Sequence, residues 1–167
     1  LAAPVADWPT KRRWADYAFS ELEKAGYTVT SAYTAVKDPE ATKFVYRDRL
    51  WTGADMVSLG VASFGHLGGI HYQNLIHIDD YIKKIEEGGA PVRRALLTTE
   101  EERFLRELIL QFKLGRVNLG DFRDKFGEKV EELFSDILAD LEKVGDISRE
   151  GDGLVLTREA LLRVDSI

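Results

Sequence analysis

The stretch from Ser58 to Asn74, SLGVASFGHLGGIHYQN, constrains the fold more than any other part of the 167-residue chain. It places four glycines, two histidines and a glutamine–asparagine pair directly after a mostly apolar run. Glycine lets the backbone adopt unusual φ angles and approach a ligand closely. The same property serves tight turning and close packing of a strand. The spacing alone therefore leaves two interpretations open, a ligand-binding loop and a packed turn.

Helical and extended patterns precede this stretch. Residues 10–26 carry apolar side chains at helical spacing and have Thr10 as a cap, which predicts a helix. Three extended segments are expected to follow, over residues 27–36, 43–51 and 54–63, with the last deeply buried. A glycine-rich loop at the carboxyl end of a buried strand is typical of ligand sites in layered α/β proteins.

The apolar period becomes helical from about residue 78 onward. A helix over residues 79–88 and a linker, APVRRAL, are predicted first. A helix then opens with a capping box from Thr98 to Glu101 and is expected to bury Leu105, Leu108, Ile109 and Phe112. A short helix, a long helix over residues 128–145, a hairpin at residues 150–153 and a last helical turn complete the pattern. Three helices and a hairpin are typical of a winged-helix module.

Charge and cysteine content narrow the function classes. The formal net charge of -6 argues against electrostatic binding of nucleic acid or anionic lipid over a broad surface. The chain has no cysteine, so it offers no thiolate to a disulfide, a metal or an iron–sulfur cluster. No apolar run approaches the roughly 20 residues that a membrane span needs. We therefore expect a cytoplasmic protein that binds neither nucleic acid nor a membrane.

Motifs that carry catalysis are sparse. The sequence has no HExxH, GxSxG, Walker or GxGxxG pattern, so we assign no catalytic residue within the chain. His66 and His71 lack a third ligand of matching spacing, so we predict no metal site. Gln73 and Asn74 either bind a polar ligand or cap the next helix. Arg93 and Arg94 either bind a carboxylate or face solvent in a linker. Phe64 belongs either to a flat apolar wall for an aromatic ligand or to the core.

Three stretches of the chain resemble a known family, the oxygen-independent coproporphyrinogen III oxidase-like radical S-adenosylmethionine proteins. They are YRDRLWTGADMVSLGVASFGHLGGIHYQNLIHIDDYIKKIEEGGAP, LTTEEERFLRELILQFKLGRVNLGDFRDKFG and GLVLTREALLRVDSI. The resemblance implies an α+β fold in three parts. These are the last strands and helices of a partial (β/α) barrel in residues 1–76, a connecting helix and linker in residues 77–97, and a helical, winged-helix-like carboxyl-terminal domain in residues 98–167.

The resemblance also implies cofactors and site residues. The family uses S-adenosylmethionine and a four-iron four-sulfur cluster (4Fe-4S) held by a CxxxCxxC triplet, which this chain lacks. We therefore expect the chain, which starts without methionine, to be the carboxyl-terminal portion of a larger enzyme and to be inactive alone. By position in the family's pattern, the residues that face the cofactor are Val45, Tyr46, Gly60, Ser63 and Phe64. The residues expected to contact the substrate are His66, His71, Gln73 and Arg94.

The function that the resemblance implies is oxidative decarboxylation of tetrapyrrole propionate side chains in porphyrin and haem biosynthesis. Two alternatives stay open. One is a haem-binding or haem-trafficking member of the same family, with His66 or His71 as an axial ligand. The other is a winged-helix protein-interaction module without ligand chemistry. If the chain is part of an enzyme, its expected partners are the tetrapyrrole substrate and the missing amino-terminal half of the barrel. An exposed strand edge also predicts that the chain pairs or dimerises.

Overall fold

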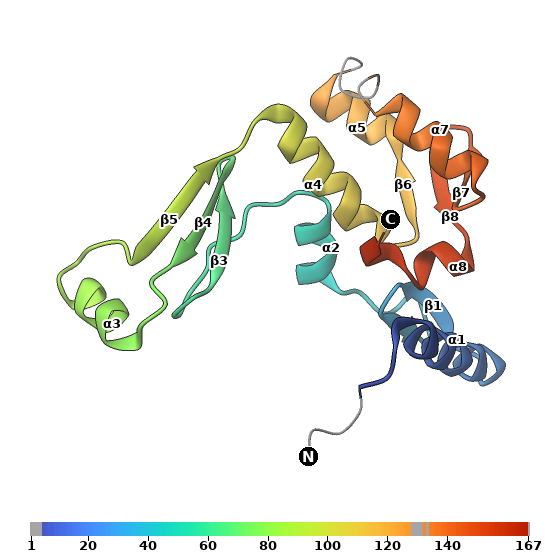
Figure 1. The fold of residues 1–167 in the computed structure, drawn as a ribbon, viewed down its shortest axis with the longest axis horizontal. Helices are drawn as coiled ribbons and strands as arrows, with labels where there is room; N and C mark the ends of the chain where they lie inside the picture. Colours follow the sequence, from blue (N-terminus) through green and yellow to red (C-terminus); the bar gives the residue numbers. More distant parts are fainter. Residues whose placement is uncertain (1–4, 128–131, 133, 167) are drawn as a thin grey trace. The chain divides into compact units, whose positions relative to one another are not determined.

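The chain folds into two compact units. The computed structural model describes residues 5–127, 132 and 134–166 (Figure 1). The terminal unit combines Leu1–Phe44 with Leu108–Ile167, and the central unit is Val45–Glu107. The sequence-based domain boundaries at residues 76 and 97 rest on the family pattern and stay predictions.

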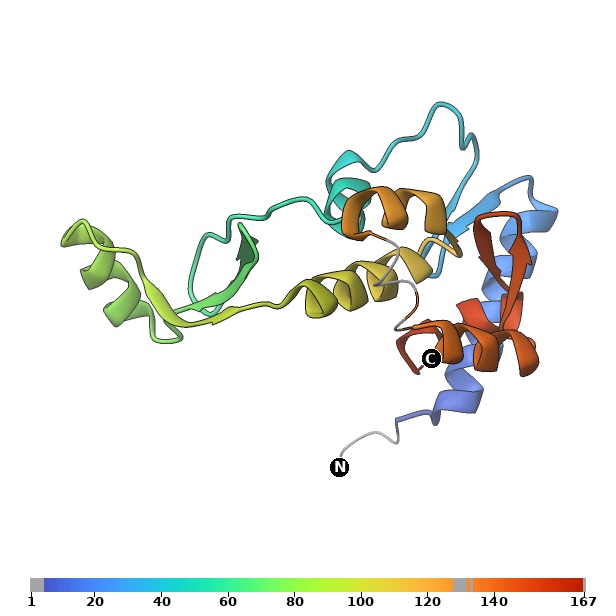
Figure 2. The same ribbon diagram turned by 90° about the horizontal axis from the view of Figure 1, so that it is seen from above.

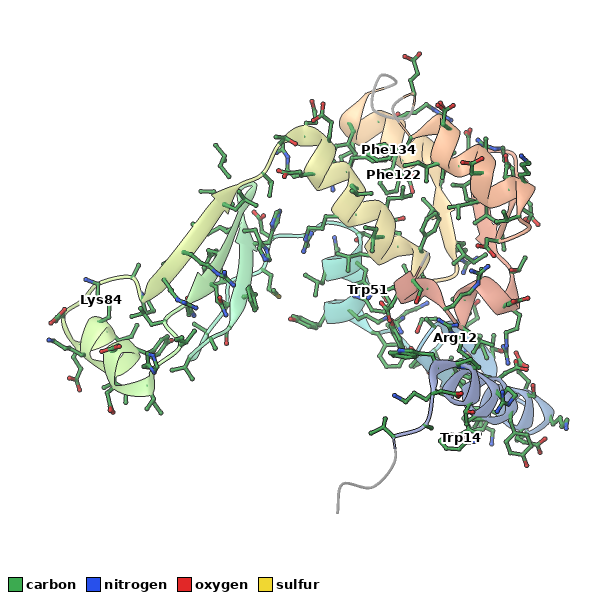
Figure 3. All side chains as sticks on the ribbon, viewed as in Figure 1. Arg12, Trp14, Trp51, Lys84, Phe122 and Phe134 are labelled. Atoms are coloured by element: carbon green, nitrogen blue, oxygen red, sulfur yellow. The ribbon has the colours of Figure 1, made fainter. Side chains whose placement is uncertain are left out.

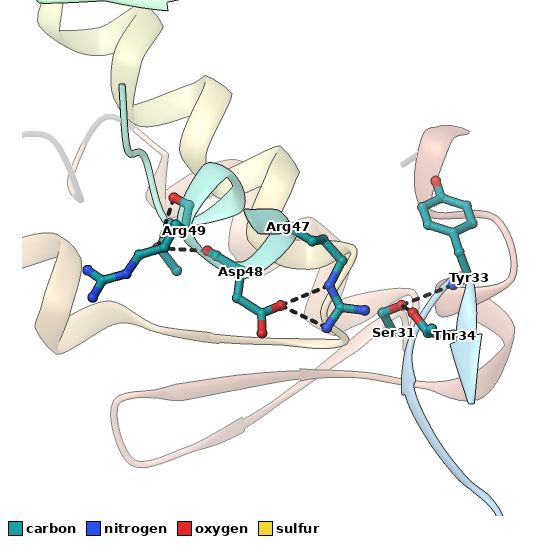
Figure 4. A network of polar contacts seen from close by, with 7 residues as sticks. Ser31, Tyr33, Thr34, Arg47, Asp48 and Arg49 are labelled. Carbon is teal, nitrogen blue, oxygen red and sulfur yellow. Dashed lines mark hydrogen bonds and ion pairs between the residues drawn. The ribbon is translucent and has the colours of Figure 1, made fainter. Parts of the chain in front are cut away.

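The terminal unit begins with a helix and a hairpin. Helix α1 spans Trp8–Lys24 and is capped by Asp7, whose carboxylate accepts a hydrogen bond from the Thr10 backbone N–H at 2.8 Å. The cap is therefore Asp7 and not Thr10, and the helix begins before the predicted residue. Strands β1 (Thr28–Ser31) and β2 (Thr34–Val36) pair antiparallel. The single extended segment predicted over residues 27–36 is thus a hairpin, closed by a hydrogen bond between the Ser31 and Thr34 hydroxyls (Figure 4).

The second half of the terminal unit builds a small sheet with helices. Strands β6, β8 and β7 lie side by side in that order and pair antiparallel. The predicted short helix, hairpin and last helical turn are all confirmed. The elements are β6 (Arg116–Asn118), α5 (Leu119–Phe126), α7 (Ser135–Lys143), β7 (Ile147–Glu150), β8 (Gly153–Leu156), α8 (Arg158–Leu161) and η1 (Val164–Ser166).

The core of this half is built from side chains of α5, α7 and β8. Phe122, labelled in Figure 3, is buried together with Leu119, Leu138 and Leu154. Of the long helix predicted over residues 128–145, residue 132 and α7 are helical and are separated by a turn at Phe134, while residues 128–131 and 133 lie outside the described residues. The winged-helix assignment stays a prediction.

Helix α4 (Glu100–Phe112) runs from the central unit into the terminal unit. It buries Phe104, Leu108 and Phe112, which follow one another at intervals of four residues. The predicted burial of Leu105 and Ile109 is wrong, because both lie beside this stripe and stay partly exposed. The predicted capping box is one residue too early. Thr99 N–H donates to the Glu102 carboxylate at 2.9 Å, and Glu102 N–H donates to the Thr99 hydroxyl at 3.1 Å.

The central unit is a three-stranded antiparallel sheet with two short helices. Strands β3, β4 and β5 lie side by side in that order. Helix α3 lies at the end of the sheet where β4 leaves and β5 begins (Figure 2). The elements are α2 (Val45–Trp51), β3 (Phe64–Leu67), β4 (Ile70–Asn74), α3 (Ile78–Glu86) and β5 (Val92–Leu97).

Three predictions for the central unit are wrong. Residues 43–51 were expected to be extended but form α2, whose carbonyl of Asp48 accepts from Thr52 N–H at 3.0 Å. Residues 54–63 contribute only a bridge between Met56 and His66, because Gly60 and Ala62 adopt positive φ angles that interrupt a strand. The expected linker APVRRAL contains β5, whose exposed charged residues are typical of an edge strand.

The fold class is mixed α and β, as predicted. All strand pairs in the described residues are antiparallel, whereas the strands of a (β/α) barrel are parallel. The partial barrel is therefore not confirmed by the pairing and stays a prediction. Among the helices of the described residues, none combines the length and apolarity that crossing a membrane requires.

Candidate functional site

The glycine-rich stretch is a β-hairpin. Gly68 and Gly69 connect β3 to β4 and have φ angles of 57° and 79°. A two-residue connection with positive φ at both positions matches the right-handed twist of the paired strands. These two glycines therefore set the turn, and the expectation of a loop at the end of a buried strand is wrong.

The hairpin register gathers the polar residues on one face of the sheet. Phe64 pairs with Gln73, and His66 pairs with His71. Strand β5 continues this face, because Arg94 pairs with Gln73 and Leu96 pairs with His71. Alternate residues of a strand point to the same side. The side chains of Phe64, His66, His71, Gln73, Arg94 and Leu96 therefore share one side, which we call the histidine face.

The histidine face carries a flat platform beside hydrogen-bonding groups. The rings of Phe64 and His71 stack with centroids 5.7 Å apart and an interplanar angle of 12°. Arg94 Nε donates to Gln73 Oε1 at 2.9 Å, and Gln73 Nε2 donates to the Ala62 carbonyl at 3.1 Å. Phe64, His71, Gln73 and Arg94 line a pocket of about 300 Å³. A planar ligand with acidic substituents matches such a surface, because aromatic rings stack and guanidinium binds carboxylate.

His66 is the most buried member of the face. It is 5% exposed, and its backbone N–H and C=O both bond to Met56. Within the described residues, the Nδ1 atoms of His66 and His71 are buried without a hydrogen-bond partner. Burial, and after it the positive charge of Arg106, lowers the pKa of His66. The imidazole of His66 is therefore neutral at pH 7.

Two arginines near this face were missed from the sequence. Arg106 is half-buried, and that burial lowers its pKa. Arg103 lies one helical turn earlier on α4, and its guanidinium lies beside Gly69. Both add positive potential around His66. The available signal was an arginine pair three residues apart on a helix that opens directly after a strand.

The residues predicted to face the cofactor do not gather at one place. Phe64 lies on the histidine face, whereas Val45 and Tyr46 line a separate pocket of about 260 Å³ next to Met56. Gly60 and Ser63 line neither pocket. Val45 and Tyr46 stand on α2, whose Arg47 forms an ion pair with Asp48 (Figure 4). All five cofactor assignments stay predictions.

The segment that contains Gly60 is held by side chains. Tyr81 of α3 accepts from Gly60 N–H at 3.0 Å, and Tyr72 accepts from Ser58 N–H at 3.0 Å. The amide of Asn74 donates to the carbonyls of Ser58 at 3.3 Å and Gly60 at 3.0 Å. Asn74 therefore serves the backbone of its own unit, and capping the next helix is not its role.

The donor set of the chain does not fit an iron–sulfur cluster. The chain contains no cysteine, and thiolates are the usual ligands of such clusters. In the part of the chain that the structure describes, no group of three or more histidine, aspartate or glutamate side chains is arranged to hold a metal ion.

Comparison with known proteins finds a family model and a solved structure to which this chain is similar. Residues 98–163 match the model of the HemN C-terminal domain. The solved structure of coproporphyrinogen III oxidase (HemN) from Escherichia coli, a radical SAM enzyme, covers 90% of this chain with a TM-score of 0.68 and 16% sequence identity. This chain covers 38% of that structure, and at this identity the likeness shows the fold alone.

Two curated relatives carry the comparison to particular proteins. The heme chaperone HemW of Bacillus subtilis is 29% identical over 113 residues, which are 67% of this chain and 30% of the relative. The oxygen-independent coproporphyrinogen III oxidase of Pseudomonas aeruginosa is 30% identical over 120 residues, which are 68% of this chain and 25% of the relative.

These matches confirm the resemblance to the oxygen-independent coproporphyrinogen III oxidase-like radical S-adenosylmethionine family, and within the chain residues 98–163 match the HemN C-terminal domain. The chain spans about a quarter to a third of the length of the curated relatives.

Proposed function

We propose that the chain supplies the tetrapyrrole-facing surface of a radical S-adenosylmethionine oxidoreductase that converts propionate side chains to vinyl groups by oxidative decarboxylation. The cluster that activates S-adenosylmethionine in such enzymes would be held by residues outside this sequence, because the sequence has no cysteine. The chain's own contribution is binding and orientation of the substrate. Inactivity of the chain alone is part of the proposal.

One observation carries the proposal, namely the convergence of His71, Gln73 and Arg94 with Phe64 at a single pocket. The stacked Phe64 and His71 rings offer a plane to a conjugated macrocycle. Arg94 is the group for a propionate, and its Nε bond to Gln73 fixes the direction of its guanidinium. A pocket of about 300 Å³ holds one acidic edge of a macrocycle rather than the whole of it.

The test is a titration of the chain with coproporphyrin III, followed by porphyrin absorbance and fluorescence. We expect saturable binding, which Arg94→Gln weakens about tenfold or more, because a hydrogen bond to a charged group contributes roughly 1.5–3 kcal/mol. Arg93→Gln is the matched control, since Arg93 neighbours Arg94 on β5 but points to the opposite side. Equal affinity of the two variants would reject the histidine face as the porphyrin site.

A second candidate function is haem binding without turnover. The Nδ1 atoms of His66 and His71 favour it, since both lack a hydrogen-bond partner among the described residues and imidazole nitrogen is an axial ligand of haem iron. The relative from Bacillus subtilis is named a heme chaperone. In this case haem gives a Soret shift that is lost in His71→Ala, and metal-free coproporphyrin III binds at least tenfold more weakly than haem.

Absence of binding by both porphyrins would contradict both candidates. A chain that binds neither ligand but captures a protein partner supports an interaction module instead. A cytoplasmic location and pairing through a strand edge stay predictions.

A further inference from the structure

The terminal unit contains a pocket of about 340 Å³ that the histidine face does not share. Its walls come from α1, from the turn between β1 and β2, and from the carboxyl-terminal turns α8 and η1. We call it the α1 pocket. Arg12, labelled on α1 in Figure 3, belongs to its lining.

The α1 pocket has an excess of positive charge. Lys11, Arg12 and Arg163 line it, and Asp165 is the acidic residue of its lining. Both carboxylate oxygens of Asp165 are occupied, because Tyr33 Oη donates to one at 2.5 Å and Lys113 Nζ donates to the other at 2.8 Å. Asp165 is therefore satisfied by groups other than the three lining cations. Arg163 forms an ion pair with Asp146, whereas Lys11 and Arg12 form no ion pair among the described residues and keep their charge for a ligand.

Two arginines that line the pocket, Arg12 and Arg163, each have a donor group without a hydrogen-bond partner among the described residues. Arg12 uses Nη2 for the Ser166 hydroxyl at 3.3 Å, and Arg163 uses Nη2 for Asp146. Among the described residues, the Nε atoms of both arginines are buried and have no hydrogen-bond partner. A buried donor without a partner costs free energy, and an anionic oxygen removes that cost.

The remaining lining of the pocket is mostly apolar, apart from the hydroxyls of Tyr33 and Ser166. Trp8 is 67% exposed, and Lys11 Nζ lies over its ring at 4.7 Å from the centroid. Ala15, Leu162 and Val164 also line the pocket. A ligand that satisfies both the cations and these walls has an acidic head and a flat or aliphatic apolar body. We propose that the α1 pocket binds a small organic carboxylate.

The experiment is a titration of the whole chain with sodium benzoate, followed by the NMR signal of the Trp8 indole N–H. The signal is assigned with Trp8→Phe. We expect a saturable shift, and the half-saturating concentration rises about tenfold in Arg12→Gln, because a charge-assisted bond is lost. Arg13→Gln is the matched control, since Arg13 follows on the same helix, bonds to Thr10 at 2.8 Å and is not part of the lining.

Two further arms keep the test decisive if Arg12→Gln loosens the fold. Lys11→Gln removes a lining charge that makes no hydrogen bond or ion pair within the described residues, so it should weaken benzoate binding without lowering the melting temperature. Inorganic phosphate at equal ionic strength tests the need for an apolar body. Phosphate binding as strong as benzoate binding would overturn the proposed ligand class. A linear shift without saturation, or equal loss in Arg13→Gln, would overturn the site.

Discussion

The side-chain amide of Asn74 lies 3.0 Å from the carbonyl oxygen of Gly60 and donates a hydrogen bond to it. Asn74 is 2% exposed, and its amide also reaches the carbonyl of Ser58. One buried side chain thus holds a segment that has no regular secondary structure. Of the polar pair Gln73 and Asn74 at the end of the glycine-rich stretch, Asn74 therefore has a structural role.

Replacing Asn74 with leucine should destabilise the central unit by about 2–4 kcal/mol, because two carbonyl groups lose their donor. Tyr81→Phe removes one bond to Gly60 N–H and should cost about 1 kcal/mol. Urea unfolding compares the two variants with the parent chain. Amide hydrogen exchange at residues 58–63 should accelerate in both. An Asn74→Leu variant as stable as Tyr81→Phe would contradict this role.

Gly65→Ala should destabilise the hairpin by roughly 1–3 kcal/mol, since overpacking forces neighbouring atoms to move. A Cβ at Gly65 would lie 2.3 Å from Tyr72 Cζ, and the ring cannot retreat without loosening its bond to Ser58 N–H. Gly68→Ala meets open space but keeps a positive φ, so its cost of about 1–2 kcal/mol is conformational. Only Gly65→Ala should shift the NMR signals of the Tyr72 ring, and an unchanged ring in that variant would refute the packing explanation.

Thr99→Ala should destabilise α4 by about 0.5–2 kcal/mol, because the capping hydroxyl that accepts from Glu102 N–H is removed. Thr99→Ser keeps an acceptor at the same place and should retain most of the stability. The free energy of unfolding and the helical circular dichroism signal measure both. Equal loss in the two variants would show that the methyl group, and not the cap, stabilises this end.

Stability should fall on acidification through the range governed by His66. Its folded pKa lies below the ordinary value of 6.5, through burial first and the charge of Arg106 second. The unfolded chain therefore takes up the proton first, and stability drops as the pH falls from about 6.5 to the folded pKa, by at most about 1.4 kcal/mol per pH unit. His66→Gln should flatten this slope, and a slope that stays the same in this variant would contradict the role of His66.

The same mechanism predicts that Arg106→Gln raises the pKa of His66 toward its ordinary value, because a positive neighbour is removed. An NMR titration of the His66 ring measures this directly. If the pKa of His66 is the same in Arg106→Gln as in the parent chain, burial alone lowers it.

The sequence by itself determined the features that depend on near neighbours in the chain. The Gly68–Gly69 pair encodes its hairpin turn through φ angles that other residues resist. Helix α1, helix α3 and the β7–β8 hairpin also follow from local patterns. The family resemblance could also be recognised from the sequence, because it rests on contiguous stretches of the chain.

Only the tertiary structure decided which side chains share the site. Arg94 reads as a linker residue until β5 pairs with β4 and sets it opposite Gln73, 21 positions earlier in the chain. Arg106 affects His66 only because α4 comes close to the hairpin. Strand register is fixed by long-range pairing, and a slip of one residue would turn every side chain of β5 to the other side of the sheet. Local patterns carry no information on that register. The family resemblance grouped His66, His71, Gln73 and Arg94, but only the folded chain shows that they share one side of a sheet.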